Sequence, residues 1–320
     1  MIAALIIIAA YVWDRVVGDP RWLPHPVIGM GKAISALERL IRRAAPSEAA
    51  LKPLGFLLPL VMAGGAFALT WGVLAGLYAV NVWLGAAVEA LLIGTTIATK
   101  GLRDAGMAVY ARLAAGDLAG ARREVGMIVG RDTETLDEPE ITRAAVETVA
   151  ENIMDAVISP LLYAAIGGAP LAMAYRAINT LDSMVGYKNE KYANLGYASA
   201  RLDDLANWIP ARLTALLIIV CALFGYDAKR AWKTALRDAP KHPSPNSGWP
   251  EAATAGALGI RLGGLNCYKG VCSFRAHMGD PVVEMGGEHI AAVCRLLTRS
   301  TLLFAILAAS VLWACGGWLL

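Results

Sequence analysis

The chain has 320 residues, of which 57% are hydrophobic and only 17% are charged, with a formal net charge of +3 at pH 7. Soluble globular proteins carry about 25% charged residues, so this composition argues against a soluble protein with a rich core. The small net charge, without an Arg/Lys tract interleaved with aromatic residues, gives no indication of nucleic-acid binding.

The N-terminal region combines a short apolar segment with a loop and a basic helix. Ile2 to Trp13 is apolar and lacks the basic region and small-residue cleavage site of a signal peptide, so we expect a retained membrane segment. A loop rich in Pro and Gly follows. Ala33 to Ala45 then predicts an amphipathic basic helix suited to a membrane surface.

The next region is strongly apolar. From Pro53 to Thr99 the only charged side chain is Glu89, and the length suits two spans of about 20 residues each. We expect a helical hairpin of Leu54 to Val80 and Val82 to Thr99, turning near Asn81. The chain is therefore predicted to be an integral membrane protein.

The middle of the chain alternates polar and apolar segments. Lys100 to Asp155 is polar and helical in pattern, and its stretch "GRDTETLDEPE" predicts a turn and a new helix start. Val157 to Ala174 is apolar but broken by Gly-Gly-Ala-Pro, and Ile209 to Gly225 is a second short apolar segment. We expect both to be re-entrant or interfacial helices that line a cavity.

The C-terminal part is predicted to be a polar region, Tyr226 to Arg299, followed by an uncharged final span, Ser300 to Leu320. No internal repeat or low-complexity linker divides the sequence. We therefore predict an all-α, polytopic membrane protein with residues 1–320 as one domain. It should have about 4–6 membrane helices, including re-entrant or interfacial segments.

Lys and Arg side chains concentrate in three segments, which predicts the orientation. These segments are about 14–53, 100–156 and 227–299. The positive-inside rule places them in the cytoplasm. If both short apolar segments crossed the membrane, 175–209 would face outward, whereas re-entrant segments keep every charged motif on one side.

The five cysteines are scattered along the chain: Cys221, Cys267, Cys272, Cys294 and Cys315. Cys267 and Cys272 lack the C-x-x-C spacing of a zinc or redox site, and no His pair accompanies them. We expect all five to be free thiols.

Three carboxylates, Glu147, Glu151 and Asp155, follow one another at intervals of four residues. On a helix they stack along one stripe, where like charges repel unless a cation lies against them. A solvated acidic face is the alternative, but an apolar segment follows at once. Because Mg²⁺ prefers hard oxygen ligands, we predict that this acidic ladder binds a divalent cation.

Two more polar clusters adjoin apolar segments. The candidates in "NTLDSMVGYKNEKY" are Asn179, Asp182, Lys188 and Lys191, and those in "ARLDDLANWIPAR" are Arg201, Asp203 and Asp204. Lysines together with backbone amides suit a phosphate. Any one of these clusters is explained by long charged side chains that reach the membrane interface and by helix capping. This explanation is weaker for three acidic clusters that each adjoin an apolar segment.

Single loop residues are weaker candidates. Arg131 is expected to bind phosphate, whereas Asp132 beside it could be a helix N-cap. His25 and Asn246 are candidate binding residues, although a lone His in a Pro-rich loop is more often structural. Glu251 lies near the expected start of a helix, where a carboxylate can simply complement the helix dipole. The residues alone thus indicate a membrane enzyme using Mg²⁺ and a phosphorylated substrate, either a transferase or a ligase.

Several long stretches resemble one family. They are "GDPRWLPHPV", "GRDT", "VETVAENIMD", "GGAPLAMAYRAINTLDSMVGYKNEKY", "ARLDDLANWIPAR" and "SPNSGWPEAATAGALGIRLGG". From about residue 11 to the last span, the chain resembles the CbiB/CobD family of cobalamin biosynthesis, adenosylcobinamide-phosphate synthase.

The resemblance implies a multi-pass enzyme of the inner membrane with its active site facing the cytoplasm. It implies a ligase that uses ATP and Mg²⁺ to join adenosylcobyric acid to (R)-1-amino-2-propanol phosphate, or to aminopropanol, through an amide bond. The catalytic candidates are Asp203, Asp204 and Asp182; the candidates for binding substrate or phosphate are Arg131, Asn179, Lys188, Lys191, Arg201, His25 and Asn246; the metal candidates are Glu147, Glu151 and Asp155. Trp22, Trp208 and Trp249 are candidates for packing against the corrin ring.

Other classes stay open. An intramembrane Mg-dependent prenyl- or phospho-alcohol transferase also places Asp and Asn clusters at the membrane face, but its N-D-x-x-D and D-G-x-x-A-R style motifs are absent from the sequence. A transporter or a membrane scaffold is a third class, but it explains the clustered acidic residues only as part of a transport path. The expected partners are the corrinoid, the amine, ATP and the lipid bilayer; a complex with other nucleotide-loop assembly enzymes and a homo-oligomer both remain open.

Overall fold

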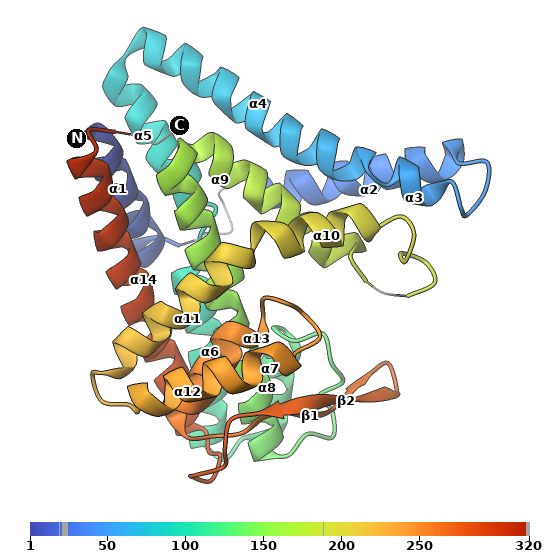
Figure 1. The fold of residues 1–320 in the computed structure, drawn as a ribbon, viewed down its shortest axis with the longest axis vertical. Helices are drawn as coiled ribbons and strands as arrows, with labels where there is room; N and C mark the ends of the chain where they lie inside the picture. Colours follow the sequence, from blue (N-terminus) through green and yellow to red (C-terminus); the bar gives the residue numbers. More distant parts are fainter. Residues whose placement is uncertain (19, 21–24, 188, 318–320) are drawn as a thin grey trace. The chain divides into compact units, whose positions relative to one another are not determined.

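The computed structural model describes residues 1–18, 20, 25–187 and 189–317. Four helical runs are long and apolar enough to cross a membrane, and the bent pair α10–α11 would add a fifth. The four are Leu51–Val80, Val82–Ala114, Glu138–Val185 and Glu288–Ala314. The predicted all-α polytopic membrane protein is confirmed (Figure 1).

The chain divides into two compact units, each built from separate segments. Unit 1 comprises Met1–Ala98, Ser159–Asn207 and Ala305–Leu320, and unit 2 comprises Thr99–Ile158 and Trp208–Phe304. The predicted domain of residues 1–320 therefore contains two compact bodies, neither of which is continuous in sequence.

The helices of unit 1 are α1 (Ile2–Val16), α2 (Pro26–Ala44), α3 (Leu51–Leu54), α4 (Leu57–Val80), α5 (Val82–Gly94), α9 (Ser159–Val185) and α10 (Tyr197–Ala206). Unit 2 holds α6 (Thr99–Ala114), α7 (Leu118–Gly126), α8 (Glu138–Ile153), the π-helical turn η1 (Met154–Ile158), α11 (Trp208–Ala222), α12 (Ala228–Asp238), the 3₁₀ turn η2 (Ala239–Lys241), α13 (Gly248–Leu258), β1 (Leu262–Tyr268) and β2 (Val271–Met278). The last helix, α14 (Glu288–Ala314), contributes to both units.

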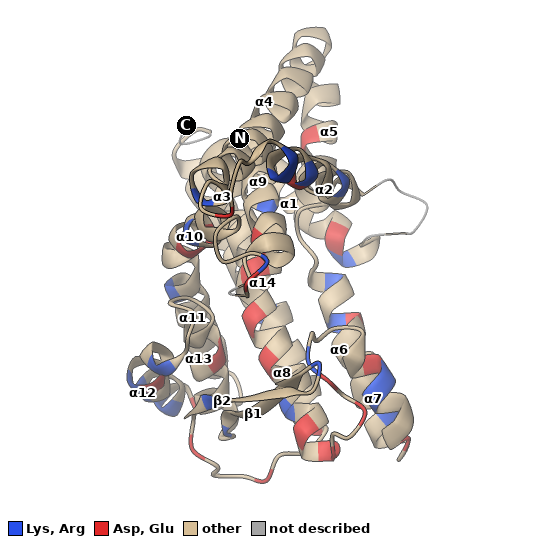
Figure 2. Cartoon of the chain, turned by 90° about the vertical axis from the view of Figure 1, so that its right-hand side faces the viewer, with Lys and Arg blue, Asp and Glu red and all other residues tan. Residues whose placement is uncertain are grey.

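The predicted hairpin of two apolar helices is confirmed as α4 and α5. Its turn lies at Asn81, whose side-chain oxygen caps α5 by accepting from the backbone N–H groups of Trp83 (2.8 Å) and Leu84 (3.1 Å). Figure 2 shows α4 without a charged residue along its length. A helix of this kind places its side chains in lipid without the cost of burying charge.

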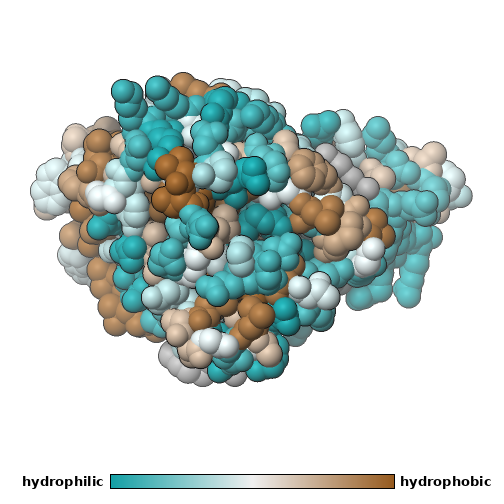
Figure 3. Space-filling model, turned by 90° about the horizontal axis from the view of Figure 1, so that it is seen from below, coloured by the Kyte–Doolittle hydropathy of each residue, from teal (hydrophilic) through white to brown (hydrophobic). Residues whose placement is uncertain are grey.

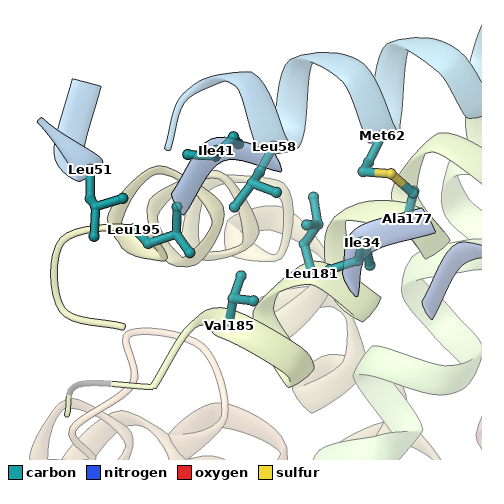
Figure 4. Packing of buried hydrophobic residues seen from close by; sticks show 9 residues of the cluster. All are labelled: Ile34, Ile41, Leu51, Leu58, Met62, Ala177, Leu181, Val185 and Leu195. Atoms are coloured by element: carbon teal, nitrogen blue, oxygen red, sulfur yellow. The ribbon is translucent and has the colours of Figure 1, made fainter. Parts of the chain in front are cut away.

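The basic helix at the N-terminal side is confirmed as α2, which begins earlier than predicted because Pro26 suits a first helical turn. Its apolar face enters a core cluster with α3, α4 and α9 (Figure 4). The buried members are Ile34, Ile41, Leu51, Leu58, Met62, Ala177, Leu181, Val185 and Leu195. The Lys and Arg side chains of α2 are left to the opposite face, as amphipathic spacing requires.

The predicted break at Gly-Gly-Ala-Pro is confirmed inside α9. Gly168 has a φ of 65°, and Pro170 supplies no N–H donor. The buried backbone N–H of Ala169 donates to Glu89 Oε1 of α5 at 3.1 Å. Tyr78 of α4 donates to the other oxygen of this buried carboxylate. The lone acid of the apolar region therefore caps the second half of a broken helix.

The β-hairpin of unit 2 was not predicted from the sequence. Strands β1 and β2 pair antiparallel, with Cys267 directly opposite Cys272, and these two residues form a disulfide. The prediction that both are free thiols is therefore wrong, because the hairpin register, which spacing alone does not reveal, places the two side chains together. Cys221, Cys294 and Cys315 are free, as predicted.

Two helix boundaries of unit 2 are informative. Helix α8 begins where the turn stretch predicted it, with a capping box between Asp137 and Glu140. Helix α14 begins at Glu288, well before the predicted start of the last span at Ser300, because its polar first turns are also helical.

Polar residues predominate on the face drawn in Figure 3, with hydrophobic ones in small groups.

Candidate functional site

In unit 1, the polar ends of α9 and α10 form a carboxylate cluster around Asp203. The Asn207 amide donates to Asp203 Oδ2 at 3.0 Å. Asp182 and Asp204 act on Asp203 as like charges, and the Asn179 amide acts as a donor. The structure therefore brings the three predicted catalytic aspartates into one electrostatic group, together with the predicted Asn179.

Asn207 connects this cluster to the beginning of α9. Its Oδ1 accepts hydrogen bonds from the hydroxyls of Ser159 (2.7 Å) and Tyr175 (2.9 Å), and all three residues are buried. Tyr163 stacks on Tyr175 with 5.1 Å between ring centroids. Asn207 belongs to the polar stretch "ARLDDLANWIPAR", but no role was predicted for it, although its position four residues after Asp203 on a helical pattern is a usable signal.

The predicted phosphate-binding cations of unit 1 lie in exposed positions over tyrosine rings. Lys191 Nζ lies 4.6 Å from the Tyr192 ring centroid, and the Arg201 guanidinium lies 5.7 Å from that of Tyr197. Arg201 also lies 3.5 Å from Asp204. Lys188 lies outside the described residues. Phosphate binding by Lys191 and Arg201 stays a prediction.

His25 caps a helix, and its predicted role in binding stays a prediction. Its Nδ1 accepts from the Val27 N–H at 3.3 Å, which makes it the N-cap of α2. Among the tryptophans, the ring centroids of Trp208 and Trp249 lie 4.2 and 4.9 Å from the Arg212 guanidinium. Trp22 lies outside the described residues.

In unit 2, Glu147 of α8 is the centre of a buried ionic network. Arg131 donates to one of its carboxylate oxygens, while Arg143 (3.3 Å) and the Gly263 N–H (2.8 Å) donate to the other. The Asn266 side-chain oxygen accepts from Arg131 (2.6 Å) and Arg143 (3.0 Å). Glu147 is 3% exposed, so this network is shielded from water.

The acidic ladder does not fit a shared metal site. Donors from protein groups already occupy Glu147, and Glu151 accepts from the Ser247 hydroxyl at 2.8 Å. Asp155 lies in η1, where the helix changes to π-helical geometry. The described part of the chain contains no group of three or more His, Cys, Asp or Glu side chains arranged to hold a metal ion. Figure 2 shows the acidic positions recurring along α8.

A polar cavity of about 160 Å³ adjoins this network in unit 2. Its polar lining consists of Arg131, Glu147, Thr148, Glu151, Asn152, Glu251, Tyr268 and Arg275. The Arg275 guanidinium donates to the Tyr268 hydroxyl at 3.1 Å. Tyr268 and Arg275 belong to the β-hairpin. Because no strand was predicted, the sequence did not indicate that these two side chains line the cavity.

Glu251 and His242 form a buried pair at this cavity. Glu251 is 2% exposed, and its Oε1 lies 3.7 Å from His242 Nε2. Burial raises the pKa of Glu251 well above its ordinary value, and the charges of Glu151 and Glu147 raise it further. Burial also lowers the pKa of His242. Burial thus shifts the pKa of each side chain in the direction that disfavours its charged form.

Asn246, a predicted binding residue, lies buried in the loop before α13. Its backbone N–H donates to the Ser244 hydroxyl at 3.2 Å, and the Ser244 N–H donates to His242 Nδ1 at 3.0 Å. Asp132 is not a helix N-cap, because its carboxylate accepts from the N–H groups of Lys269 (2.9 Å) and Gly270 (2.8 Å) at the hairpin turn.

Comparison with known proteins gives a consistent result. The family model described as CobD/Cbib protein matches residues 7–297. A cobalamin biosynthesis protein CobD from Geobacter metallireducens is 49% identical over 308 residues, covering 96% of each chain. A cobalamin biosynthesis protein CbiB from Salmonella typhimurium is 45% identical over 309 residues, again covering 96% of each. No solved structure matches the chain. The chain therefore belongs to the CobD/CbiB family of cobalamin biosynthesis proteins.

Proposed function

We propose that the protein is a ligase that joins adenosylcobyric acid to (R)-1-amino-2-propanol phosphate, or to aminopropanol, in an ATP- and Mg²⁺-dependent reaction. With the phosphorylated amine, the product is adenosylcobinamide phosphate. The observation that carries this proposal is the carboxylate cluster of Asp182, Asp203 and Asp204 beside the apolar helices of unit 1. Membership in a cobalamin biosynthesis family supports the choice of pathway.

The reaction needs an activated acid. A carboxylate oxygen of the corrinoid attacks the terminal phosphorus of ATP, forming an acyl phosphate and releasing ADP. The free amine then attacks the acyl carbon, the amide bond forms, and inorganic phosphate leaves. The amine must first lose the proton of its ammonium form, so the site needs a base as well as cations that stabilise the developing charge.

Mg²⁺ fits Asp182 and Asp203 better than it fits the acidic ladder. Asp203 Oδ1 is buried and accepts no hydrogen bond within the described residues, and Asp182 and Asn179 act on the same carboxyl group. Among the described residues, no guanidinium pairs with Asp203, whereas Arg131 and Arg143 occupy Glu147. Mg²⁺ usually binds one or two carboxylates together with substrate phosphates, whose charge it neutralises. Asp182 and Asp203 would hold the ion, and Asp204 would complete the metal site.

The cations of unit 1 would hold the phosphates of ATP. Lys191 and Arg201 are held over tyrosine rings and remain exposed, so their charges stay available to an anion. The concentration of Lys and Arg in segments 14–53, 100–156 and 227–299 supports an active site facing the cytoplasm from the inner membrane.

A reconstituted assay tests the proposal. Purified protein in detergent is given adenosylcobyric acid, aminopropanol phosphate, ATP and Mg²⁺, and amide product and ADP are measured. Asp182→Asn and Asp203→Asn should each lower turnover by about 100-fold or more. Glu190→Gln, an exposed acid of the neighbouring loop, should leave turnover unchanged.

Two outcomes would contradict the proposal. Near-wild-type turnover of both Asp variants at limiting Mg²⁺ would remove the metal assignment. Absence of ATP-dependent amide product, with pyrophosphate released from a prenyl diphosphate instead, would favour an intramembrane transferase.

A further inference from the structure

The cavity of unit 2 is small and carries both signs of charge. Its volume of about 160 Å³ lies below the ~300–1,000 Å³ of pockets that hold drug-sized ligands. It corresponds to about five water molecules at ~30 Å³ each. A nucleotide or a corrin ring is too large for this space, whereas a compact molecule of a few carbon atoms fits.

The acidic part of the cavity contains a carboxylate that lacks a donor. Glu251 is 2% exposed and lines the cavity, and within the described residues its carboxylate accepts no hydrogen bond. His242 Nε2 lies 3.7 Å from its Oε1. Glu151 lines the same cavity and has one side-chain donor, Ser247. A buried acid without donors is destabilising unless a ligand supplies them. A primary ammonium brings three donors and a positive charge.

The basic part of the cavity contains a guanidinium without a carboxylate partner. Arg275 donates to the Tyr268 hydroxyl and forms no ion pair with any residue that the structure describes. Arg131, by contrast, is occupied by Glu147 and Asn266. A guanidinium presents a planar set of donors that matches phosphate or carboxylate. Arg275 is therefore the group in this lining that is suited to an anion.

We propose that this cavity binds a small zwitterionic amine, with its ammonium group at Glu251 and Glu151 and its phosphate group at Arg275. The assignment rests on the proposed function, because that reaction consumes an amino alcohol bearing a phosphate. It places recognition of the amine substrate in unit 2, on residues that the sequence analysis did not assign to it.

Binding measured apart from turnover tests the assignment. Titration calorimetry with the full-length protein in detergent, without ATP or corrinoid, uses 1-amino-2-propanol phosphate and O-phosphoethanolamine as zwitterionic probes. Ethanolamine and propyl phosphate each carry one charged end only. The zwitterions should bind at least tenfold more tightly than either single-ended probe.

Variants locate the site. Glu251→Gln keeps the side-chain size and should weaken binding of the zwitterions at least tenfold without weakening binding of propyl phosphate. Arg275→Gln should weaken both phosphate-bearing probes at least tenfold. Lys269→Gln removes an exposed cation from the same hairpin and should leave every affinity unchanged. Thermal unfolding of each variant distinguishes a loss of binding from a loss of folding. Because Arg275 is only partly buried, the Arg275→Gln variant tests the site independently of the buried Glu251.

The outcomes distinguish this inference from the proposed function. Zwitterion binding with the stated dependence on Glu251 and Arg275, but no ATP-dependent amide product, would leave the cavity assignment standing and remove the ligase. Amide synthesis in which both variants keep the wild-type KM for the amine would overturn the cavity assignment and leave the ligase. Failure of the wild-type protein to bind either zwitterion at millimolar concentration would also overturn it.

Discussion

Replacing Glu147 by Gln tests whether this residue is a structural counter-ion or a metal ligand. The substitution keeps the side-chain size and removes one charge from a network in which Arg131 and Arg143 are each 9% exposed and Glu147 is 3% exposed. Two guanidiniums that shared one carboxylate then remain buried without it. The structure predicts a large loss of stability.

The magnitude follows from the burial. Removing one partner of a buried ion pair costs about 3–5 kcal/mol, because the remaining charge stays uncompensated. For a body of roughly 150–250 residues, each kcal/mol lowers the melting temperature by ~2–4 °C. The Glu147→Gln protein should therefore unfold roughly 6–20 °C below the wild type. Thermal unfolding of purified protein in one detergent, followed by tryptophan fluorescence in EDTA, measures the shift.

Glu151→Gln is the matched control, one helical turn further along α8. In the described part of the chain, Glu151 accepts one side-chain hydrogen bond, from Ser247, so its replacement should cost about 1 kcal/mol. Equal shifts for the two variants would refute the counter-ion reasoning. So would a stable Glu147→Gln protein in EDTA that loses only a Mg²⁺-dependent rise in melting temperature, because that is the behaviour of a metal ligand.

Three further predictions concern other parts of the chain. Glu89→Ala should lower the free energy of unfolding by about 1–3 kcal/mol, because the Ala169 N–H and the Tyr78 hydroxyl lose their acceptor. Glu89→Gln keeps an acceptor and should cost less. Melting temperatures in detergent compare the two variants, and equal losses would contradict the capping role. The raised pKa of Glu251 means that the folded state holds a proton which the unfolded state loses above its ordinary pKa of about 4.5, so this residue lowers stability as the pH rises. The melting temperature of Glu251→Gln relative to wild type should therefore increase from pH 5 to pH 8, and a constant difference would contradict the raised pKa. Alkylation without a reductant, followed by peptide mass spectrometry, should modify Cys315 and leave Cys267 and Cys272 unmodified. The disulfide spans a sequence separation of five and should contribute about 2 kcal/mol to the free energy of unfolding. Modification of all three cysteines would show that the disulfide is absent.

Local sequence signals were sufficient wherever one segment determines its own structure. The apolar run before and after Asn81 predicted α4 and α5, because a stretch of this length with Glu89 as its only charge suits a helix, which satisfies its own backbone hydrogen bonds in lipid. Asp137 and Pro139 predicted the start of α8, because capping is a contact among neighbouring residues. The Gly-Gly-Ala-Pro stretch predicted the break in α9 for the same local reason.

The functional residues were harder to assign, because their roles depend on partners far away in the sequence. The acidic ladder has the spacing of a metal site, yet Arg131 and Gly263 reach Glu147 from other elements and give it a structural role. Asp203 was a candidate from its neighbours in sequence, but only the packing of α9 against α10 shows that Asp182 acts on it. The resemblance named the family, which the comparisons confirm, without assigning these contacts.

The sequence by itself determined a polytopic helical membrane protein, its main helices and its family, because hydrophobic length, helix capping and long motifs are all properties of contiguous residues. Only the tertiary structure paired Cys267 with Cys272 and buried Glu251 in the same cavity lining as Arg275, with no donor to its carboxylate from the residues that the structure describes. The physical reason is that burial and ion pairing depend on which distant segments meet. The same carboxylate is a solvated charge, a counter-ion or a binding group according to the side chains that surround it.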